Sequence, residues 1–239
     1  MFKAYMNWSG GKDSTLALYN VMKEGKYQVD CLLTSINAVH DRISMHGVRR
    51  SLLEKQAQLL GLPLVTLEMP EQPSMEEYEN LLQQKIRAFK QQGYDYSIFG
   101  DIFLEDLRKY REEKLSSLAI QPVFPLWKID TRELVKQFIE LGFKTIVVCV
   151  NGQYLDKSFC GRIIDEQFLR DLPDNVDPCG ENGEFHTFVY DGPMFQHPLT
   201  FSIGEIVYKE YDAPKSSADV CGQSVDNTNN YGFWFCDLV

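Results

Sequence analysis

Several features of exported, membrane-bound and zinc-binding proteins are missing from this sequence. No apolar run approaches the roughly 18 residues that a membrane span needs, and residues 1–8 hold a charged and a polar residue before a glycine turn. We therefore expect neither a transmembrane segment nor a signal peptide. The six cysteines form no C-x-x-C pair and have no histidine at zinc-ligand spacing. They are Cys31, Cys149, Cys160, Cys179, Cys221 and Cys236. Free thiols and a cytoplasmic location are the expectation.

An excess of positive charge is also missing. The formal net charge is -10, which disfavours broad binding to nucleic acid or to acidic membranes but still allows a local basic patch. With 239 residues and 44% hydrophobic content, the chain resembles an ordinary globular protein of one large or two smaller domains. Small molecules are therefore the first class of ligand to consider.

Short apolar runs alternate with segments of helical period in the first half of the sequence. The predicted strands are residues 2–8, 29–36, 62–69, 96–100 and a weaker one at 120–127. The helical segments between them end at Gly25, Gly61 and Gly93. Strands separated by helices form parallel sheets with right-handed crossovers and both faces covered. The sequence therefore predicts an α/β fold, a doubly wound parallel sheet, for residues 1–127.

A smaller, loop-rich α/β domain is predicted for residues 128–212. Asp130 and Glu133 indicate a helix start, residues 144–150 a strand, and residues 201–212 a further strand. Residues 171–198 are rich in Gly, Pro, Asn and Asp, which favours ordered loops.

The tail, residues 213–239, has two parts. Residues 213–230 are polar, and we expect them to be mobile. Residues 231–238, "YGFWFCDL", are too aromatic to stay in water. We expect this segment to dock on the body of the protein or on a neighbouring subunit, which would make the protein a homo-oligomer.

The stretch "SGGKDS", residues 9–14, lies between the first predicted strand and the first predicted helix. In an open parallel sheet this turn is a favoured phosphate site, because glycines admit the anion and the helix start offers free N–H groups and a positive dipole end. Lys12 adds a positive charge, and Ser9 and Ser14 add hydroxyl donors. Asp13 would repel phosphate unless a divalent cation lay between them, so its presence suggests magnesium.

Two common phosphate-binding motifs do not fit this turn. The Walker A pattern requires a glycine where Met6 stands and a serine or threonine where Asp13 stands. The dinucleotide pattern G-x-G-x-x-G is absent as well. The structural alternative is a solvent-exposed turn capped by Asp13 or Ser14.

The turn resembles the pyrophosphate-binding loop of the PP-loop ATP pyrophosphatases, which split ATP into an adenylate and pyrophosphate. Further stretches are similar to the diphthine–ammonia ligase branch: "SMHGVRRSLLEKQAQLLGLPL" at 44–64, "GDIFLEDLRKYRE" at 100–112, "FPLW" at 124–127 and "GENGEFHTFVYDGPMF" at 180–195. The resemblance implies a Rossmann-like fold of the adenine nucleotide alpha hydrolase type. It also implies an ATP-binding domain at 1–127 and an acceptor-substrate domain at 128–212. The implied nucleotide-binding set is Ser9, Gly10, Gly11, Lys12, Asp13, Ser14, His46, Gly100 and Asp101.

Some members of this set have ordinary structural explanations too. Asp101, after the fourth predicted strand, could bind magnesium or an amine, or it could cap the helix that begins near Leu104. His46 could be a cap or a surface residue, but the family carries a histidine here close to the nucleotide. Arg111 could bind a carboxylate or phosphate, whereas for Arg108 we favour a solvated charged face.

The segment "GENGEFH" supplies the remaining candidates. Glu181, Glu184 and His186 could orient an amine or take its proton, and Asn182 could contact the acceptor. The alternative is a turn whose polar groups bind their own backbone. Related ligases carry Gly-Glu-Gly-Gly-Glu here, so Asn182 and His186 depart from that pattern and leave the acceptor open.

The resemblance implies an AMP-forming ligase that uses ATP, Mg²⁺ and ammonia. A substrate carboxylate would attack the α phosphorus, and ammonia would then convert the adenylate to an amide. The predicted catalytic residues are Lys12, Asp13, Glu181, Glu184 and His186, with Asp13 as the magnesium ligand. No glutaminase segment is visible, so we expect free ammonia or an external nitrogen donor.

Several alternatives remain at this level. The acceptor could be a modified protein side chain, as the family name suggests, or a small carboxylate metabolite. A tRNA-modifying PP-loop enzyme would call for a basic RNA-binding surface that the sequence does not show. A non-catalytic sensor of adenine nucleotides would need the glycine turn but would have no evident use for Asp13 or residues 181–186.

Overall fold

The computed structural model describes residues 1–71, 74–211 and 231–239. Their N-terminal half forms a mainly parallel sheet with the order β4-β2-β1-β5-β6. These strands are β1 (Phe2–Asn7), β2 (Tyr27–Asn37), β4 (Leu64–Met69), β5 (Tyr96–Ile98) and β6 (Gln121–Val123). A short strand, β3 (Arg42–Ile43), pairs antiparallel with the end of β2. The predicted doubly wound sheet is confirmed.

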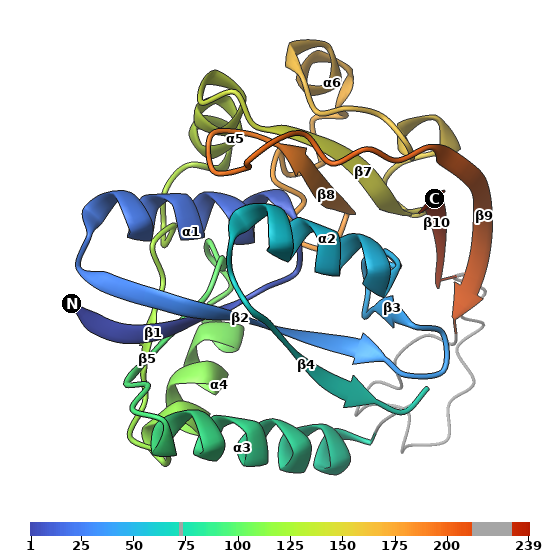
Figure 1. Cartoon of the computed structure of the whole chain (residues 1–239). Helices are drawn as coiled ribbons and strands as arrows, with labels where there is room; N and C mark the ends of the chain where they lie inside the picture. Colours follow the sequence, from blue (N-terminus) through green and yellow to red (C-terminus); the bar gives the residue numbers. More distant parts are fainter. Residues whose placement is uncertain (72–73, 212–230) are drawn as a thin grey trace.

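Helices cover both faces of this sheet (Figure 1): α1 and α2 lie on one face and α3 and α4 on the other. They are α1 (Lys12–Glu24), α2 (Arg50–Leu60), α3 (Met75–Gln91) and α4 (Glu105–Ser116). The first two end at Gly25 and Gly61, both with φ of 69°, where a left-handed backbone favours glycine. Since β2 and β5 flank β1 on opposite sides, the chain reverses its strand order next to β1. The carboxyl ends of strands at such a reversal form a ligand crevice.

A second, antiparallel sheet has the order β8-β7-β10-β9. Its strands are β7 (Lys144–Asn151), β8 (Phe185–Asp191), β9 (Ile203–Tyr211) and β10 (Tyr231–Leu238). The helices of this half are α5 (Thr131–Glu140), the 3₁₀ helix η1 (Lys157–Phe159) and α6 (Glu166–Asp171). Asp130 caps α5 as predicted, accepting a hydrogen bond from the Glu133 N–H. The prediction of loops throughout 171–198 is wrong for β8, whose alternating Phe185, Thr187 and Val189 are buried.

The end of the chain lies inside the second sheet rather than beside it. Strand β10 pairs with β7 on one side and β9 on the other. Phe233 and Cys236 are buried, which is the docking that the aromatic composition predicts. Residues 213–230, predicted to be mobile, lie outside the described residues. Among the helices that the structure describes, none is long and apolar enough to cross a membrane.

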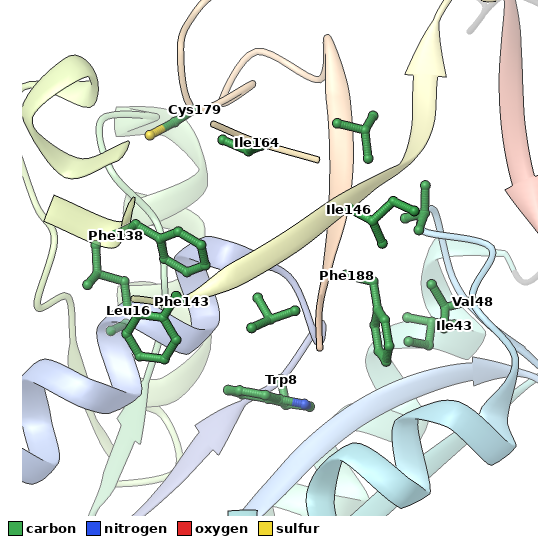
Figure 2. Close-up of a cluster of buried hydrophobic side chains, with 14 of the residues drawn as sticks. Trp8, Leu16, Ile43, Val48, Phe138, Phe143, Ile146, Ile164, Cys179 and Phe188 are labelled. Carbon is green, nitrogen blue, oxygen red and sulfur yellow. The ribbon is translucent and has the colours of Figure 1, made fainter. Parts of the chain in front are cut away.

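The largest hydrophobic core of the described residues lies between the two sheets and includes the buried faces of α1 and α2. Figure 2 shows Trp8 of the first sheet's turn, Phe188 of β8 and Ile146 of β7 among its members. Strand β1 is buried on both faces, since Ala4 and Met6 join this cluster while Tyr5 joins a second one beneath α3 and α4. Each fully buried large apolar side chain contributes about 1.5–3 kcal/mol to folding. The turn after β1 is therefore anchored between two packed layers.

Candidate functional site

The glycine turn connects β1 to α1 and leaves little room for side chains. Gly10 has a φ of 76°, and a Cβ at this position would lie 3.0 Å from Gln56 Oε1. A Cβ on Gly11 would lie 3.1 Å from both His46 Cε1 and the Thr187 carbonyl oxygen. Gly11 begins the helix without a side-chain cap. Lys12 N already donates to Thr187 Oγ1, so the remaining N–H groups of the first turn and the positive end of the helix dipole are left for an approaching anion.

Gly100, at the carboxyl end of β5, lies directly against the start of α1. A Cβ on Gly100 would come within 2.8 Å of Ser14 N and 2.9 Å of Asp13 C. Glycine therefore keeps open the space in front of the first helical N–H groups. The sequence prediction placed Gly100 and the glycine turn on one sheet edge, and the structure brings them into contact.

The turn is held by polar contacts from α2 and β8. Gly10 O accepts hydrogen bonds from Val189 N at 2.9 Å and from Gln56 Nε2 at 3.0 Å. Gln56 Oε1 accepts a bond from Trp8 Nε1 at 2.8 Å, and Lys12 N donates to Thr187 Oγ1 at 3.0 Å. Sequence analysis missed Trp8, Gln56 and Thr187. Gln56 carried a signal, because it is a polar residue beside Leu52, Leu53 and Ala57 on the buried face of α2.

Lys12 is a buried cation at the base of the turn, with 3% of its surface exposed. Its Nζ lies 2.8 Å from Asp13 Oδ2 and also donates to the Cys179 carbonyl oxygen. Burial by itself lowers the pKa of Lys12, but the Asp13 carboxylate reverses this effect and the net pKa is raised. Lys12 therefore remains positively charged where an anion would approach.

A pocket of about 510 Å³ opens at this edge of the sheet, a size typical of small-molecule sites. Its walls combine the turn with segments of both halves of the chain. The predicted site residues that line it are Ser9, Gly11, Lys12, Asp13, Ser14, His46, Gly100, Asp101, Arg111, Glu181 and His186. The pocket also contains residues that the sequence analysis did not select, among them Thr34, Ser35, Met45, Tyr78 and Tyr110.

Glu181 is a titratable group on the wall of the pocket. Its Oε1 accepts a hydrogen bond from Ile102 N at 2.8 Å. Burial raises the pKa of Glu181 to about 7 despite this bond, and the charge of Asp13 acts in the same direction. A carboxyl group with this pKa can exchange a proton near neutral pH.

Glu184 and Asn182, in contrast, hold the loop together. Glu184 is 1% exposed; its Oε1 accepts bonds from Asp177 N and Asn182 Nδ2, both at 3.0 Å, and its Oε2 accepts one from Asn182 N at 2.9 Å. Neither residue is among those that line the pocket. The loop already uses the acceptor oxygens of Glu184, as in the alternative of a turn whose polar groups bind their own backbone. A catalytic Glu184 and a substrate-binding Asn182 stay predictions.

Two neutral histidines face each other at the other side of the turn. The rings of His46 and His186 are 4.7 Å apart, and His46 Nδ1 donates to the Thr187 carbonyl oxygen at 3.1 Å. Burial lowers the pKa of His46 to about 4 and that of His186 to about 3. In the described part of the chain, His186 Nε2 is buried without a hydrogen-bond partner. At neutral pH this pair offers uncharged donors and acceptors, not a base that readily takes a proton.

Asp101 and Arg111, which both line the pocket, form a bidentate ion pair. Arg111 Nε donates to Asp101 Oδ2 at 2.5 Å and Arg111 Nη2 to Oδ1 at 3.1 Å, and the guanidinium lies over the Phe99 ring. Each charge is compensated by the other. Arg108 instead pairs with Glu112 on α4 at 2.7 Å, which agrees with the charged-face interpretation.

Few side chains of the pocket could coordinate a metal ion. Within residues 1–71, 74–211 and 231–239, no group of three or more His, Cys, Asp and Glu residues could hold a metal ion. Asp13 lines the pocket with 29% of its side chain exposed. A single accessible carboxylate fits Mg²⁺ only as an ion that shares its coordination with nucleotide phosphates and water.

Comparison with known proteins places the chain in a family. Residues 2–120 match the diphthamide synthase N-terminal domain, and residues 130–215 match the diphthamide synthase C-terminal domain. The chain belongs to the diphthamide synthase family. Diphthine–ammonia ligases of Danio rerio and Mus musculus are each 26% identical over 86% of this chain, covering 88% and 85% of those proteins. The human diphthine–ammonia ligase is 25% identical over 73% of this chain and 67% of its own length.

Family membership confirms the predicted branch of PP-loop enzymes and its class, the ATP-using carbon–nitrogen ligases. Two solved structures align with part of the chain. A predicted subunit of tRNA methyltransferase from Methanocaldococcus jannaschii aligns with a TM-score of 0.43 at 18% identity, over 62% of this chain and 80% of its own. A U34-tRNA thiolase from Methanococcus maripaludis aligns with a TM-score of 0.37 at 14% identity, over 59% and 58%.

Proposed function

We propose that this protein is an AMP-forming ligase that adenylates a carboxylate and converts it to an amide with ammonia. The observation that carries the proposal is the convergence of the 9–14 turn and the 179–187 segment on one pocket. The first supplies an anion site and the second supplies a titratable carboxyl group. The cytoplasmic location predicted from the sequence suits such an enzyme.

In this proposal the triphosphate of ATP lies against the start of α1. The N–H groups of the first helical turn and the buried ammonium of Lys12 stabilise the charge that develops on departing pyrophosphate. Lys12 would exchange its contact with Asp13 for one with phosphate. Asp13 would hold Mg²⁺, which supplies charge neutralisation of the phosphates when it is bound.

Glu181 is the residue that we assign to the amine. Ammonium must lose a proton before its nitrogen can attack an acyl-adenylate. The Glu181 carboxylate, whose pKa is raised to about 7, is a stronger base for that proton than an ordinary carboxylate. His46 and His186 would border the nucleotide as neutral groups. They would therefore add no positive charge near the incoming ammonium. Asp101 and Arg111 form the wall beyond Gly100 and would orient the substrate.

The acceptor is the least constrained part of the proposal. The relatives are named for diphthine, and a modified protein side chain of that kind is our first candidate. A small carboxylate is the second candidate, because Asn182 and His186 change the acceptor loop relative to the pattern that the sequence resemblance implies. A homo-oligomeric state would not alter either assignment.

The test is formation of AMP and pyrophosphate from ATP with Mg²⁺ and ammonium, with a diphthine-bearing protein in one reaction and a metabolite extract in another. Amide formation coupled one-to-one to AMP supports the ligase. ADP as the product, or tight ATP binding without turnover in either reaction, would contradict it and favour a nucleotide sensor.

A further inference from the structure

The turn that carries His46 is a strained segment on the wall of the pocket. We call residues 43–48 the His46 turn. Within it, Met45 has a φ of 66° and Gly47 a φ of 72°. A left-handed backbone is costly for methionine and persists where the surroundings hold it in place. Met45 and His46 both line the pocket, so whatever holds this turn also shapes the site.

Strand β10 contacts the His46 turn through an aromatic ring. The Cβ of any larger residue at Gly47 would lie 2.8 Å from Phe235 Cδ1, so the ring packs directly on the glycine backbone. Backbone bonds also hold the turn: Ile43 N to Val48 O at 2.8 Å, His46 N to Ser44 O at 2.8 Å, Gly47 N to Ile43 O at 3.0 Å, and Ser44 N to Ser35 O of β2 at 3.3 Å. Phe235 therefore packs against the turn without lining the pocket.

The same strand fixes the two ends of the turn through one carboxylate. Asp237 Oδ1 accepts a bond from Arg42 Nη1 at 2.9 Å and one from Arg49 Nε at 3.1 Å, and Oδ2 accepts one from Arg49 Nη2 at 2.6 Å. Arg42 Nη1 also donates to the Gly47 carbonyl oxygen at 2.7 Å. Hydrogen bonds from Arg49 and Arg42 lower the pKa of Asp237 to about 2, so the carboxylate is charged at any physiological pH.

These contacts form a chain from the C-terminus to the glycine turn. Asp237 and Phe235 hold the His46 turn, and His46 in turn lies over Gly11 and donates to the Thr187 carbonyl oxygen. Strand β10 begins at Tyr231, beyond the residues that match the family domains, which end at 215.

We propose that β10 is a positioning element of the nucleotide pocket, with Asp237 and Phe235 fixing the His46 turn and thereby setting the affinity for ATP. The inference rests on the proposed function only in taking ATP as the nucleotide. Asp237 is a positioning residue: it does not line the pocket and acts through Arg42, Arg49 and His46.

The experiment compares Asp237→Asn with Asp171→Asn in the full chain. Asp171 makes an ion pair of similar exposure with Arg162 at 2.7 Å, at the end of α6 and outside the pocket, so it controls for the loss of a surface ion pair. We expect Asp237→Asn to weaken ATP binding, measured by calorimetry, about fivefold and to speed hydrogen exchange at the amides of residues 43–48. Asp171→Asn should change neither quantity, and Asp237→Glu should restore most of the affinity. In turnover, KM for ATP should rise while kcat at saturating ATP changes little.

Unchanged ATP affinity in Asp237→Asn, with or without faster exchange in the turn, overturns the proposal. An equal loss of affinity in Asp171→Asn also overturns it, because the effect would then be general destabilisation. Should Asp237→Asn fail to fold, Arg49→Gln provides the same comparison while leaving the Arg42 pair. Binding is measured separately from turnover. A protein that binds ATP but forms no AMP would therefore refute the ligase proposal, while its ATP affinities would still test the role of β10.

Discussion

The two loops that meet at the pocket are built in opposite ways. Residues 9–14 contribute mainly backbone: two glycines, a helix start without a side-chain cap, and carbonyl groups tied to α2 and β8. Residues 177–187 are folded around a buried side chain, Glu184, whose oxygens accept three hydrogen bonds from Asp177 and Asn182. The first loop therefore depends on small residues that leave space at the helix start, and the second depends on one buried acid whose oxygens are bonded within the loop.

We expect the strongest loss of activity from a change at Lys12, the buried cation of the first loop. Lys12→Ala removes a buried charge next to the developing pyrophosphate, and we expect AMP formation to fall on the order of 10²–10³-fold. The matched control is Lys23→Ala, since Lys23 is exposed in the last turn of the same helix. A pyrophosphate-release assay measures both. Equal activity in the two variants would contradict a role for Lys12 in catalysis.

The next variant, at Glu181, tests whether the second loop takes part in proton transfer. Glu181→Gln should lower kcat on the order of 10²-fold. In the wild type, the base must be deprotonated, so kcat/KM for ammonium should rise with pH through the pKa of about 7 at Glu181. The variant should lose this rise, whereas Glu205→Gln on the exposed face of β9 should keep it. A pH–rate profile that is the same in Glu181→Gln and the wild type would remove Glu181 from the mechanism.

Glu184→Gln, in the second loop, should act on folding. The new amide group would face N–H donors in a buried site, so we expect the free energy of unfolding to fall by about 1–3 kcal/mol. Urea denaturation measures this change, again with Glu205→Gln as control. If the stability is unchanged but turnover at saturating substrates is lost, Glu184 has the catalytic role first predicted from the sequence.

The smallest effect concerns the backbone of the first loop. Gly100→Ala places a Cβ 2.8 Å from Ser14 N, so the start of α1 must shift. We expect KM for ATP to rise roughly tenfold with a smaller change in kcat, because the lost interaction acts on nucleotide binding. Steady-state kinetics in parallel with urea denaturation separate this from unfolding. An unchanged KM would show that the helix start does not contact the phosphates.

Some residues of this site could be predicted from the sequence, and others could not. The 9–14 turn was predicted because its residues are consecutive and their conformational needs are local. Gln56 and Thr187 were missed, since their contacts with Gly10 and Lys12 N span 46 and 175 residues along the chain. Glu184 was predicted to be catalytic and Asn182 to bind substrate, because a residue type does not reveal whether its polar atoms are already bonded.

Periodicity, glycine placement and the "SGGKDS" stretch were enough, in the sequence alone, to predict a doubly wound sheet with an anion site after its first strand. These features follow from the dihedral preferences and hydrophobic spacing of neighbouring residues. The tertiary structure alone decided that β10 lies between β7 and β9, that Asp237 meets Arg42 and Arg49, and that Glu184 faces inward. Such contacts depend on which distant surfaces are buried together, and no local pattern in the chain encodes that choice.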